Sequence, residues 1–409
     1  MPNFRWLHLS DWHGGTREHG DYWPELCERF FDDLKALHRE AGPWDVVLFT
    51  GDLTQSGEAG QFSQLDGFLD LLWEVLEKLG SRPLLLAVPG NHDLERPNDA
   101  EMVAVLRAWS GKPQIRDAFL DTADSPPRQL VKDAFRHYQN WWKNRQAAGI
   151  HAGLLPGDFS YTFAKGEGKN AVKIGILGLN SAFLQLADGK YQGKLALHTR
   201  QFHAACGGNG PAWAKEHHLC LLLTHHPQDW LRPDVRKEVR QFIDTPGRFA
   251  AHLFGHRHEA SLIHISEGDA PGRNVWQSPS LFGSEYFQDA AGGSQQRLFG
   301  YSAGRLAITG QDSAELTFWP RIAEPHQAGP LVFRADHAVV YENTIHTRPV
   351  AVKLNRHFAG HIEQASLAPT SVATGNSPAN SKTNVQINTI SGGNVTGNQF
   401  IVEQNNTAK

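Results

Sequence analysis

The chain has 409 residues, 40% of them hydrophobic and 10% aromatic, which is enough apolar material for one large domain with appendages or for two domains. A net charge of −4 excludes a global basic field that would attract nucleic acid or an anionic membrane. The sequence has no run of about 18 apolar residues, so it predicts no membrane-spanning helix. Three cysteines without paired spacing argue against disulfides and a thiolate zinc site. Because the N-terminus lacks the apolar core of a signal peptide, we expect a cytoplasmic protein.

Short apolar runs, each ending in polar residues or glycine, predict strands buried on both faces; they span residues 4–13, 44–54, 83–93, 172–182, 218–227 and 250–259. Residues 22–40 and 58–80 lie between the first three runs and have helical spacing. This alternation predicts βαβ crossovers and an α/β core. Shorter strands of a second, antiparallel-leaning sheet are predicted at residues 261–266, 274–281, 304–310 and 314–320. We therefore expect two packed sheets flanked by helices over residues 1–330.

Polar side chains follow five of the predicted strands, at the points where the strands end. They are Asp11-x-His13, Gly51-Asp52, Asn91-His92-Asp93, His225-His226-Pro227 and Gly255-His256-x-His258. In open α/β sheets, ligands collect beyond the carboxyl ends of the strands, so these turns are expected to converge. Imidazole, carboxylate and amide ligands without a thiolate suit Mn, Fe or Zn. Two such ions about 3.5–4 Å apart can clamp a phosphoryl group and lower the pKa of a bridging water.

The order of these motifs, within "HLSDWH", "FTGDLT" and "VPGNHD", resembles the calcineurin-like metallophosphoesterase superfamily. The closest resemblance is to its bacterial branch that contains the cyclic-nucleotide phosphodiesterases. The resemblance spans residues 4–320 and is loose between residues 95 and 170, where an insert or cap is expected. It implies a four-layer α/β/β/α sandwich with two central mixed sheets, and a catalytic domain over residues 1–330.

Carried over residue by residue, the resemblance implies two divalent metal ions, with Mn favoured over Fe or Zn. One ion would be held by Asp11, His13 and His258, and the other by Asn91, His225 and His256. Asp52 would bridge both ions. His92 would protonate the leaving oxygen and Asp93 would orient the His92 ring. His226 is the doubtful member of its pair, while His8 and His264 are expected to be structural.

The leading functional hypothesis is a dinuclear metal-dependent phosphodiesterase, in which a hydroxide that bridges the metals attacks a cyclic or linear nucleotide. The runner-up substrate is DNA or RNA, because the superfamily also contains nucleases, although the acidic net charge disfavours extended duplex binding. A third hypothesis is a scaffold that kept the fold and lost catalysis. The complete set of ligands argues against it.

Residues 128–146, within the expected insert, combine basic and aromatic side chains. They could hold phosphates and stack a base, or they could form an amphipathic helix that docks by its aromatic face. We favour the second interpretation.

The composition changes towards the C-terminus. Residues 331–365 are expected to form an extension, and residues 366–383, rich in Ser, Ala, Pro and Thr, a flexible linker. Residues 384–405 are β-prone and rich in Asn and Gly, which suits cross-β stacking. They resemble the amyloid-signalling motifs of bacterial effectors, which pair with an NLR-like receptor in defence systems. We expect them to be disordered in the monomer and to order by stacking, although a disordered tail or a strand that caps an oligomer remain alternatives.

Overall fold

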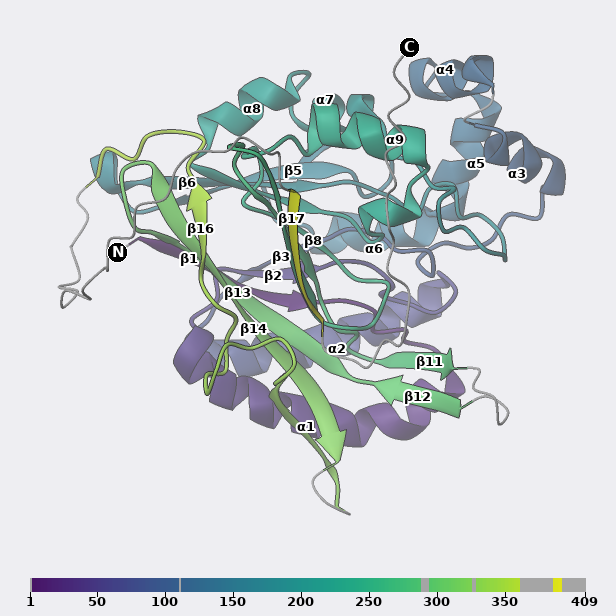
Figure 1. Ribbon diagram of the computed structural model, residues 1–409. Helices are drawn as coiled ribbons and strands as arrows, with labels where there is room; N and C mark the ends of the chain where they lie inside the picture. Colours follow the sequence, from purple (N-terminus) through teal and green to yellow (C-terminus); the bar gives the residue numbers. More distant parts are fainter. Residues whose placement is uncertain (1, 110–111, 288–293, 326–328, 361–384, 392–409) are drawn as a thin grey trace, which may run out of the picture.

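A computed structural model describes residues 2–109, 112–287, 294–325, 329–360 and 385–391. Two mixed sheets pack face to face, and helices cover the outer face of each sheet (Figure 1). The predicted α/β fold, a four-layer α/β/β/α sandwich, is therefore confirmed. None of the helices in the described ranges has the length and apolar character needed to cross a membrane.

The first sheet contains the three N-terminal strands, which are parallel neighbours: β1 (Asn3–Leu9), β2 (Val46–Phe49) and β3 (Leu84–Ala87). On its other side β1 pairs antiparallel with β13, so segments from both ends of the fold meet there. The sheet continues through four antiparallel strands: β13 (Gly300–Ile308), β14 (Ser313–Pro325), β15 (Leu331–Ala335) and β16 (Val350–Lys353).

The second sheet has a parallel centre made of β6 (Val172–Gly178), β7 (Leu219–Leu223), β8 (Ala251–Phe254) and β10 (Arg273–Gln277). Antiparallel strands flank this centre: β4 (His151–Ala152), β5 (Phe159–Lys165), β9 (Ser261–Glu267) and β17 (Val385–Ser391). A separate hairpin is formed by β11 (Gly283–Phe287) and β12 (Ser294–Leu298).

Helices α1 (Arg17–Ala41) and α2 (Ala59–Lys78) cover the first sheet, and α7 (Thr199–Ala205), α8 (Gly210–Glu216) and α9 (Pro233–Glu238) cover the second (Figure 1). Helix α1 starts where the Thr16 side chain accepts a hydrogen bond from the His19 amide at 2.9 Å. Its buried residues recur every three or four positions, which presents one apolar face to the sheet: Trp23, Cys27, Phe30, Leu34 and Leu37.

In its described residues, the expected insert contains four α-helices: α3 (Ala100–Arg107), α4 (Pro113–Asp121), α5 (Pro126–Ala134) and α6 (Arg136–Arg145). The aromatic side chains of residues 128–146 are buried. The Tyr138 hydroxyl donates to the Ala87 carbonyl at 2.8 Å, and Trp141 stacks on Phe62 with ring centroids 5.6 Å apart. The interpretation of residues 128–146 as a segment docked by its aromatic face is confirmed, and these rings are not available to stack a base.

Aromatic side chains fill the space between the two sheets. Trp276 of β10 stacks on Phe318 of β14 with ring centroids 4.2 Å apart and an interplanar angle of 8°. On the outer side of the first sheet, the buried Asp33 carboxylate of α1 accepts hydrogen bonds from Tyr301 at 2.6 Å and from Nε of Arg321 at 2.8 Å. This network ties the longest helix to β13 and β14.

The sheet membership of the later strands differs from the prediction. Residues 304–310 and 314–320 belong to β13 and β14, which join the first sheet on the β1 side, whereas 261–266 and 274–281 supply β9 and β10, which join the second sheet on the β8 side. Residues 331–360 add β15 and β16 to the first sheet. An apolar run identifies a strand, but its partner depends on distant segments, so the prediction of one separate antiparallel sheet was wrong.

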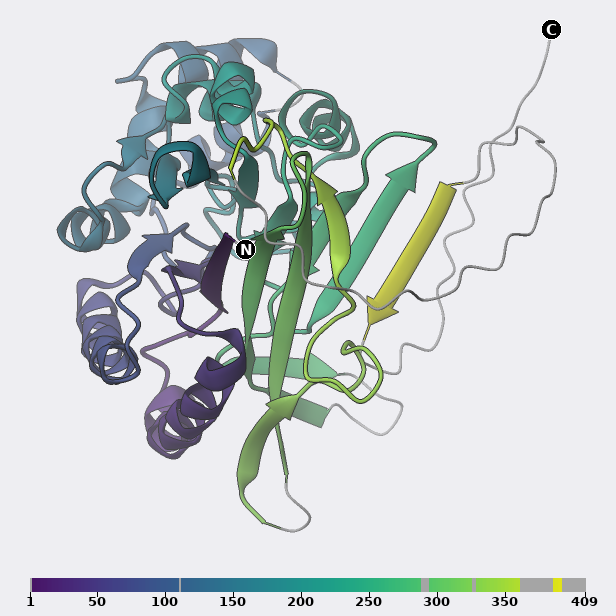
Figure 2. The same ribbon diagram turned by 90° about the vertical axis from the view of Figure 1, so that its left-hand side faces the viewer.

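The C-terminal segment is described only for β17. This strand pairs with β9 from Val385 opposite Glu267 to Ser391 opposite Ser261, and Figure 2 shows it in yellow at the sheet edge. Residues Val385–Ser391 form a strand, in keeping with the β-propensity predicted for this segment. The linker predicted at 366–383 and the remainder of the motif, 392–405, lie outside the described residues.

Candidate active site

The predicted side chains converge at one edge of the sandwich, because each follows a parallel strand. Asp11 and His13 follow β1, Asp52 follows β2, and Asn91 to Asp93 follow β3. From the second sheet, His225 and His226 follow β7, and His256 and His258 follow β8. The carboxyl ends of both sheets therefore supply ligands to one site.

Two groups of potential metal ligands can be distinguished. In the first, Nε2 of His258 lies 3.4 Å and Nε2 of His13 lies 3.9 Å from Oδ1 of Asp11. In the second, Nε2 of His225 lies 3.2 Å from Oδ1 of Asn91 and 3.1 Å from Nδ1 of His256. These are the two sets that the sequence predicts.

Asp52 lies between the two groups. Its Oδ2 is 3.2 Å from Nε2 of His225 in the second group and 4.0 Å from Nε2 of His13 in the first. The carboxylate is almost fully buried, and the His92 amide donates to its Oδ1 at 2.8 Å. The position fits the bridging ligand that the resemblance implies.

His226, the doubtful member of its pair, also belongs to the cluster. Its Nε2 lies 3.1 Å from Oδ1 of Asn91, as close as Nε2 of His225. Its Nδ1 contacts the Ser181 hydroxyl at 3.0 Å. The sequence holds no signal for this contact, because Ser181 lies 45 residues away on the loop after β6. His8 and His264 bond instead to Thr50 and Asn274, in keeping with structural roles.

The backbone of the cluster is strained. Among the described residues, six non-glycine residues have a positive φ, and five are predicted ligands: Asp11 (55°), His13 (49°), Asp52 (51°), His256 (73°) and His258 (62°). Such left-handed conformations are uncommon for residues other than glycine, although Asn, Asp and His adopt them more often than the rest, and they persist where the surrounding structure enforces them. Their concentration here indicates turns shaped to aim side chains at one point.

The electrostatics of the cluster favour ionised carboxylates, neutral imidazoles at His13 and His256, and a protonated imidazole at His225. Burial lowers the pKa of His13 and His256 to about 3. Burial opposes the charged form of His225 too, but the Asp52 and Asp11 carboxylates outweigh it and raise that pKa to about 9. Burial alone would raise the pKa of Asp52, yet the neighbouring His225 and His92 bring it well below its usual value.

The donor set fits divalent metal ions. Asp11 and Asp52 are buried, and among the described residues no Lys or Arg forms an ion pair with either. Both ring nitrogens of His13 are buried without a hydrogen-bond partner in the described part of the chain. The Nδ1 atom of His225 contacts the Thr50 carbonyl at 2.8 Å, which keeps a proton on Nδ1, so Nε2 is the nitrogen that would bind a cation in exchange for its own proton.

His92 lies beside the cluster, with its ring centroid 4.9 Å from that of His13. Its Nδ1 contacts the Gln55 carbonyl at 2.8 Å, so Nε2 is the nitrogen available to a ligand. The Asp93 carboxylate instead accepts from the Thr54 amide and the Gly90 amide, both at 2.8 Å. Burial and the charge of Asp52 raise the pKa of Asp93 to about 6. The prediction that Asp93 orients the His92 ring was therefore wrong: Asp93 holds the turn, and a backbone carbonyl holds the ring.

A cavity of about 440 Å³ opens over the first group of ligands, lined by His13, Thr16, Arg17, Glu18, Gln55, His92, His258 and Phe282. On the other side of the cluster, the Trp230 ring packs edge-on against His256, with centroids 4.0 Å apart. The sequence analysis missed Trp230, although it stands only three residues after the Pro227 that closes the histidine-pair motif.

The sequence of the whole site region matches a known family. Residues 4–260 match the calcineurin-like phosphoesterase family. The chain belongs to this family. No curated protein matches the chain.

Three solved structures are similar to this calcineurin-like phosphoesterase at low identity. GAP50 of Plasmodium, the anchor in the inner membrane complex, is 10% identical over 82% of this chain and 88% of its own, with a TM-score of 0.39. Purple acid phosphatase PPD1 from yellow lupin (Lupinus luteus) seeds is 11% identical over 91% of this chain and 57% of its own, with a TM-score of 0.41. YfkN of Bacillus subtilis, a calcineurin-like phosphoesterase, is 11% identical over 88% of this chain and 92% of its own, with a TM-score of 0.33.

Family membership defines the broad chemistry of this calcineurin-like phosphoesterase. It indicates a metal-dependent hydrolase of phosphoric esters, and the clustered ligands are the candidate metal-binding residues.

Proposed function

We infer that this calcineurin-like phosphoesterase is a dinuclear phosphodiesterase that acts on nucleotides, with Mn²⁺ as its preferred metal. The observation that carries this inference is the meeting of two ligand groups around the buried Asp52 carboxylate. Asp11, His13 and His258 would hold one ion, and Asn91, His225 and His256 would hold the other. Nitrogen and oxygen ligands without a thiolate suit Mn²⁺, and Fe and Zn²⁺ are the alternatives.

The bound ions supply Lewis-acid chemistry, because they polarise the phosphoryl oxygens and lower the pKa of water. The chain positions them. The Thr50 carbonyl fixes the tautomer of His225, and the His92 amide fixes the Asp52 carboxylate. Thr50 and Asp52 are both buried, so these contacts hold the ligands before substrate arrives.

His92 donates a proton to the leaving oxygen in this proposal. Its contact with the Gln55 carbonyl keeps one proton on Nδ1, so a second proton on Nε2 is the one that is transferred. His92, His13 and His258 all line the cavity over the first ligand group, where a substrate would enter.

The preference for a phosphodiester rests on the motifs "HLSDWH", "FTGDLT" and "VPGNHD", which resemble the cyclic-nucleotide phosphodiesterase branch. The test is hydrolysis of bis(p-nitrophenyl) phosphate, p-nitrophenyl phosphate, cyclic nucleotides, and single- and double-stranded DNA, each with Mn²⁺ and with EDTA. Faster turnover of the diesters than of the monoester supports the proposal. Activity towards the monoester alone, or activity unchanged by EDTA, contradicts it. Cleavage confined to DNA would make the chain a nuclease.

The C-terminal residues 384–405 are proposed to assemble, either with themselves or with an NLR-like receptor in a bacterial defence system. Support comes from their Asn- and Gly-rich composition and from the strand formed by Val385–Ser391. In the single chain this strand pairs with β9, so assembly requires its release from that edge. A peptide of residues 384–405 should form thioflavin-positive fibrils, and its deletion should leave hydrolysis intact. A peptide that stays monomeric at high concentration contradicts the proposal.

A further inference from the structure

A second cavity, of about 410 Å³, lies between α3 and the loop that follows β6. Its lining consists of Arg107, Trp109, Leu184, Asp188, Gly189, Lys190, Tyr191, Lys194 and Arg232. Among the described lining residues, none is shared with the cavity over the metal ligands. The volume lies within the range of about 300–1,000 Å³ that is usual for small-molecule sites.

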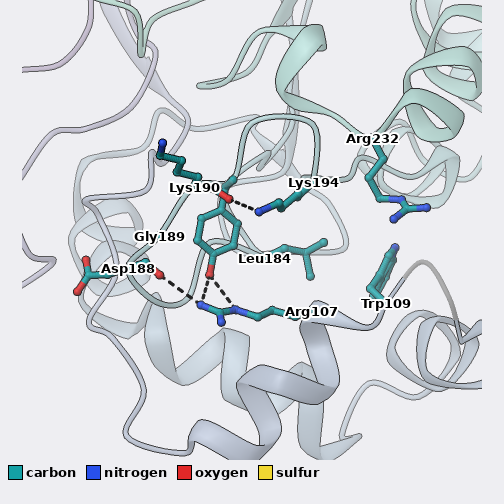
Figure 3. Close-up of a pocket in the computed structure, with 9 residues that line it drawn as sticks. Arg107, Trp109, Leu184, Asp188, Gly189, Lys190, Lys194 and Arg232 are labelled. Atoms are coloured by element: carbon teal, nitrogen blue, oxygen red, sulfur yellow. Dashed lines mark hydrogen bonds between the residues drawn. The ribbon is translucent and has the colours of Figure 1, made fainter. Parts of the chain in front are cut away.

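The lining is strongly cationic in a chain whose net charge is −4. It contains four basic side chains and one carboxylate, that of Asp188. Asp188 forms an ion pair with Arg96, which is not part of the lining, and in Figure 3 its carboxylate points away from Arg107. Arg232 pairs with Asp234 at 3.1 Å. In the described part of the chain, no carboxylate forms an ion pair with Arg107, Lys190 or Lys194.

Two of the cationic side chains, those of Arg107 and Lys194, are held in place by neutral groups. Nε and Nη2 of Arg107 donate to the hydroxyl of the buried Tyr191 at 3.2 and 3.0 Å, and Nη2 also donates to the Asp188 carbonyl at 3.3 Å. Nζ of Lys194 donates to the Lys190 carbonyl at 2.7 Å. These partners are neutral, so they orient the cations without neutralising their charge. Figure 3 shows the Arg107 and Lys194 side chains beside the buried Leu184, with the Arg232 guanidinium pointing towards Trp109.

The chemistry of this cavity selects a ligand with several adjacent negative charges. One carboxylate would meet only one of the three cations that lack a carboxylate partner, whereas a chain of phosphates presents charge and acceptor oxygens to all of them. We propose that this cavity binds a ligand with two or more linked phosphate groups.

The cavity is connected to the metal centre through a short path. Leu195 forms a parallel bridge with Leu231. The Leu195 amide donates to the Trp230 carbonyl at 3.1 Å, and the Leu195 carbonyl accepts from the Arg232 amide at 3.0 Å. Trp230 in turn packs against the metal ligand His256. The linked phosphates could therefore belong to the far end of the substrate or to a separate effector, which share the same chemistry.

Binding is tested with inorganic tripolyphosphate as the probe and lysine acetylation, read by mass spectrometry, as the readout. We expect tripolyphosphate to protect Lys190 and Lys194, and to leave the exposed Lys143 and Lys215 reactive. The Asp52→Ala variant should show the same protection, which separates this cavity from the metal centre. Equal protection of all four lysines, or protection that disappears with Asp52→Ala, overturns the proposal.

A charge-matched pair of variants tests the affinity. Lys190→Glu/Lys194→Glu should weaken tripolyphosphate binding in calorimetry at least about tenfold, because two charge-assisted contacts become repulsive. Lys143→Glu/Lys215→Glu makes the same change in net charge outside the cavity and should bind as the unchanged chain does. Equal affinities for the two double variants overturn the proposal.

Kinetics identifies the source of the phosphates. If they belong to the substrate, Lys190→Glu/Lys194→Glu raises KM for nucleotides with a phosphate chain and leaves hydrolysis of bis(p-nitrophenyl) phosphate unchanged. If they belong to an effector, tripolyphosphate changes the rate of bis(p-nitrophenyl) phosphate hydrolysis in the unchanged chain and not in the double variant. A rate change of equal size in both proteins counts against the cavity, because it points to direct binding at the metal ions.

Discussion

Gly90 precedes the proposed ligand Asn91, and the structure predicts that a single methyl group on Gly90 disables the site without removing any proposed ligand. A Cβ atom on Gly90 would lie 2.1 Å from Oδ1 of Asp52 and 2.4 Å from the Asp52 amide nitrogen. Ordinary van der Waals contact begins near 3.4 Å, so the carboxylate or the turn has to move by about 1 Å. The neighbouring backbone cannot yield as a flexible side chain would.

The expected size of the effect follows from this displacement. A misplacement of about 1 Å in a catalytic constellation costs about 100-fold in rate, and overpacking costs about 1–3 kcal/mol of stability. Gly90→Ala should therefore fold, bind less metal and hydrolyse bis(p-nitrophenyl) phosphate about 100-fold more slowly. Metal analysis, steady-state kinetics and thermal unfolding measure the three quantities.

Gly67→Ala is the matched control. Gly67 lies within α2, and a Cβ there meets nothing within 4 Å. The same substitution should leave activity unchanged and stabilise the helix by about 0.5–1 kcal/mol. If Gly90→Ala retained full metal content and full activity, the close approach of the two turns would not determine the position of Asp52, and the reasoning would be refuted.

Three further predictions concern side chains. Asp52→Ala should lose most bound metal and nearly all hydrolysis, because it removes the carboxylate shared by both groups; two ions per chain in that variant would contradict this. His92→Ala should keep its metal but turn over about 10²–10⁴-fold more slowly, with a smaller loss for p-nitrophenyl than for alkyl leaving groups; equal losses argue against proton donation. Asp33→Ala leaves the buried Arg321 guanidinium without its carboxylate partner, and should lower the free energy of unfolding by about 3–5 kcal/mol in denaturant titration. Asp32→Ala, at the exposed neighbouring position, is the control and should change that free energy by less than about 0.5 kcal/mol.

The positions of the ligands were predictable because they depend on local patterns. Asp11, Asp52 and Asn91 each follow an apolar run, and parallel strands bring such run ends together at one edge of a sheet. The strands that pair with β13 and β14 were not predictable, because an apolar run indicates that a strand is buried but does not indicate which strand pairs with it.

The contacts that orient the site were less accessible to sequence reasoning. Gln55 acts on His92 through its backbone carbonyl. Every residue type carries that group, so the identity of residue 55 gives no signal for the contact. Asp93 stands next to His92 in the sequence, which suggested a contact with the ring, but its carboxylate turns towards the Thr54 and Gly90 amides. Adjacent residues in a turn point in different directions, so proximity along the chain is a poor guide to side-chain partners there.

Each ligand group contains residues from both sheets: Asp11 and His13 with His258, and Asn91 with His225 and His256. Metal ions bound there would act as cross-links between the two layers, in addition to the apolar packing and the hydrogen bonds that join them. The three described cysteines are unpaired and buried, so no disulfide performs this task. Metal at 100 times its dissociation constant would add about 2.7 kcal/mol to the free energy of unfolding. Metal supply would then set the thermal tolerance of the sandwich as well as its catalytic rate, and a chelator would lower both together.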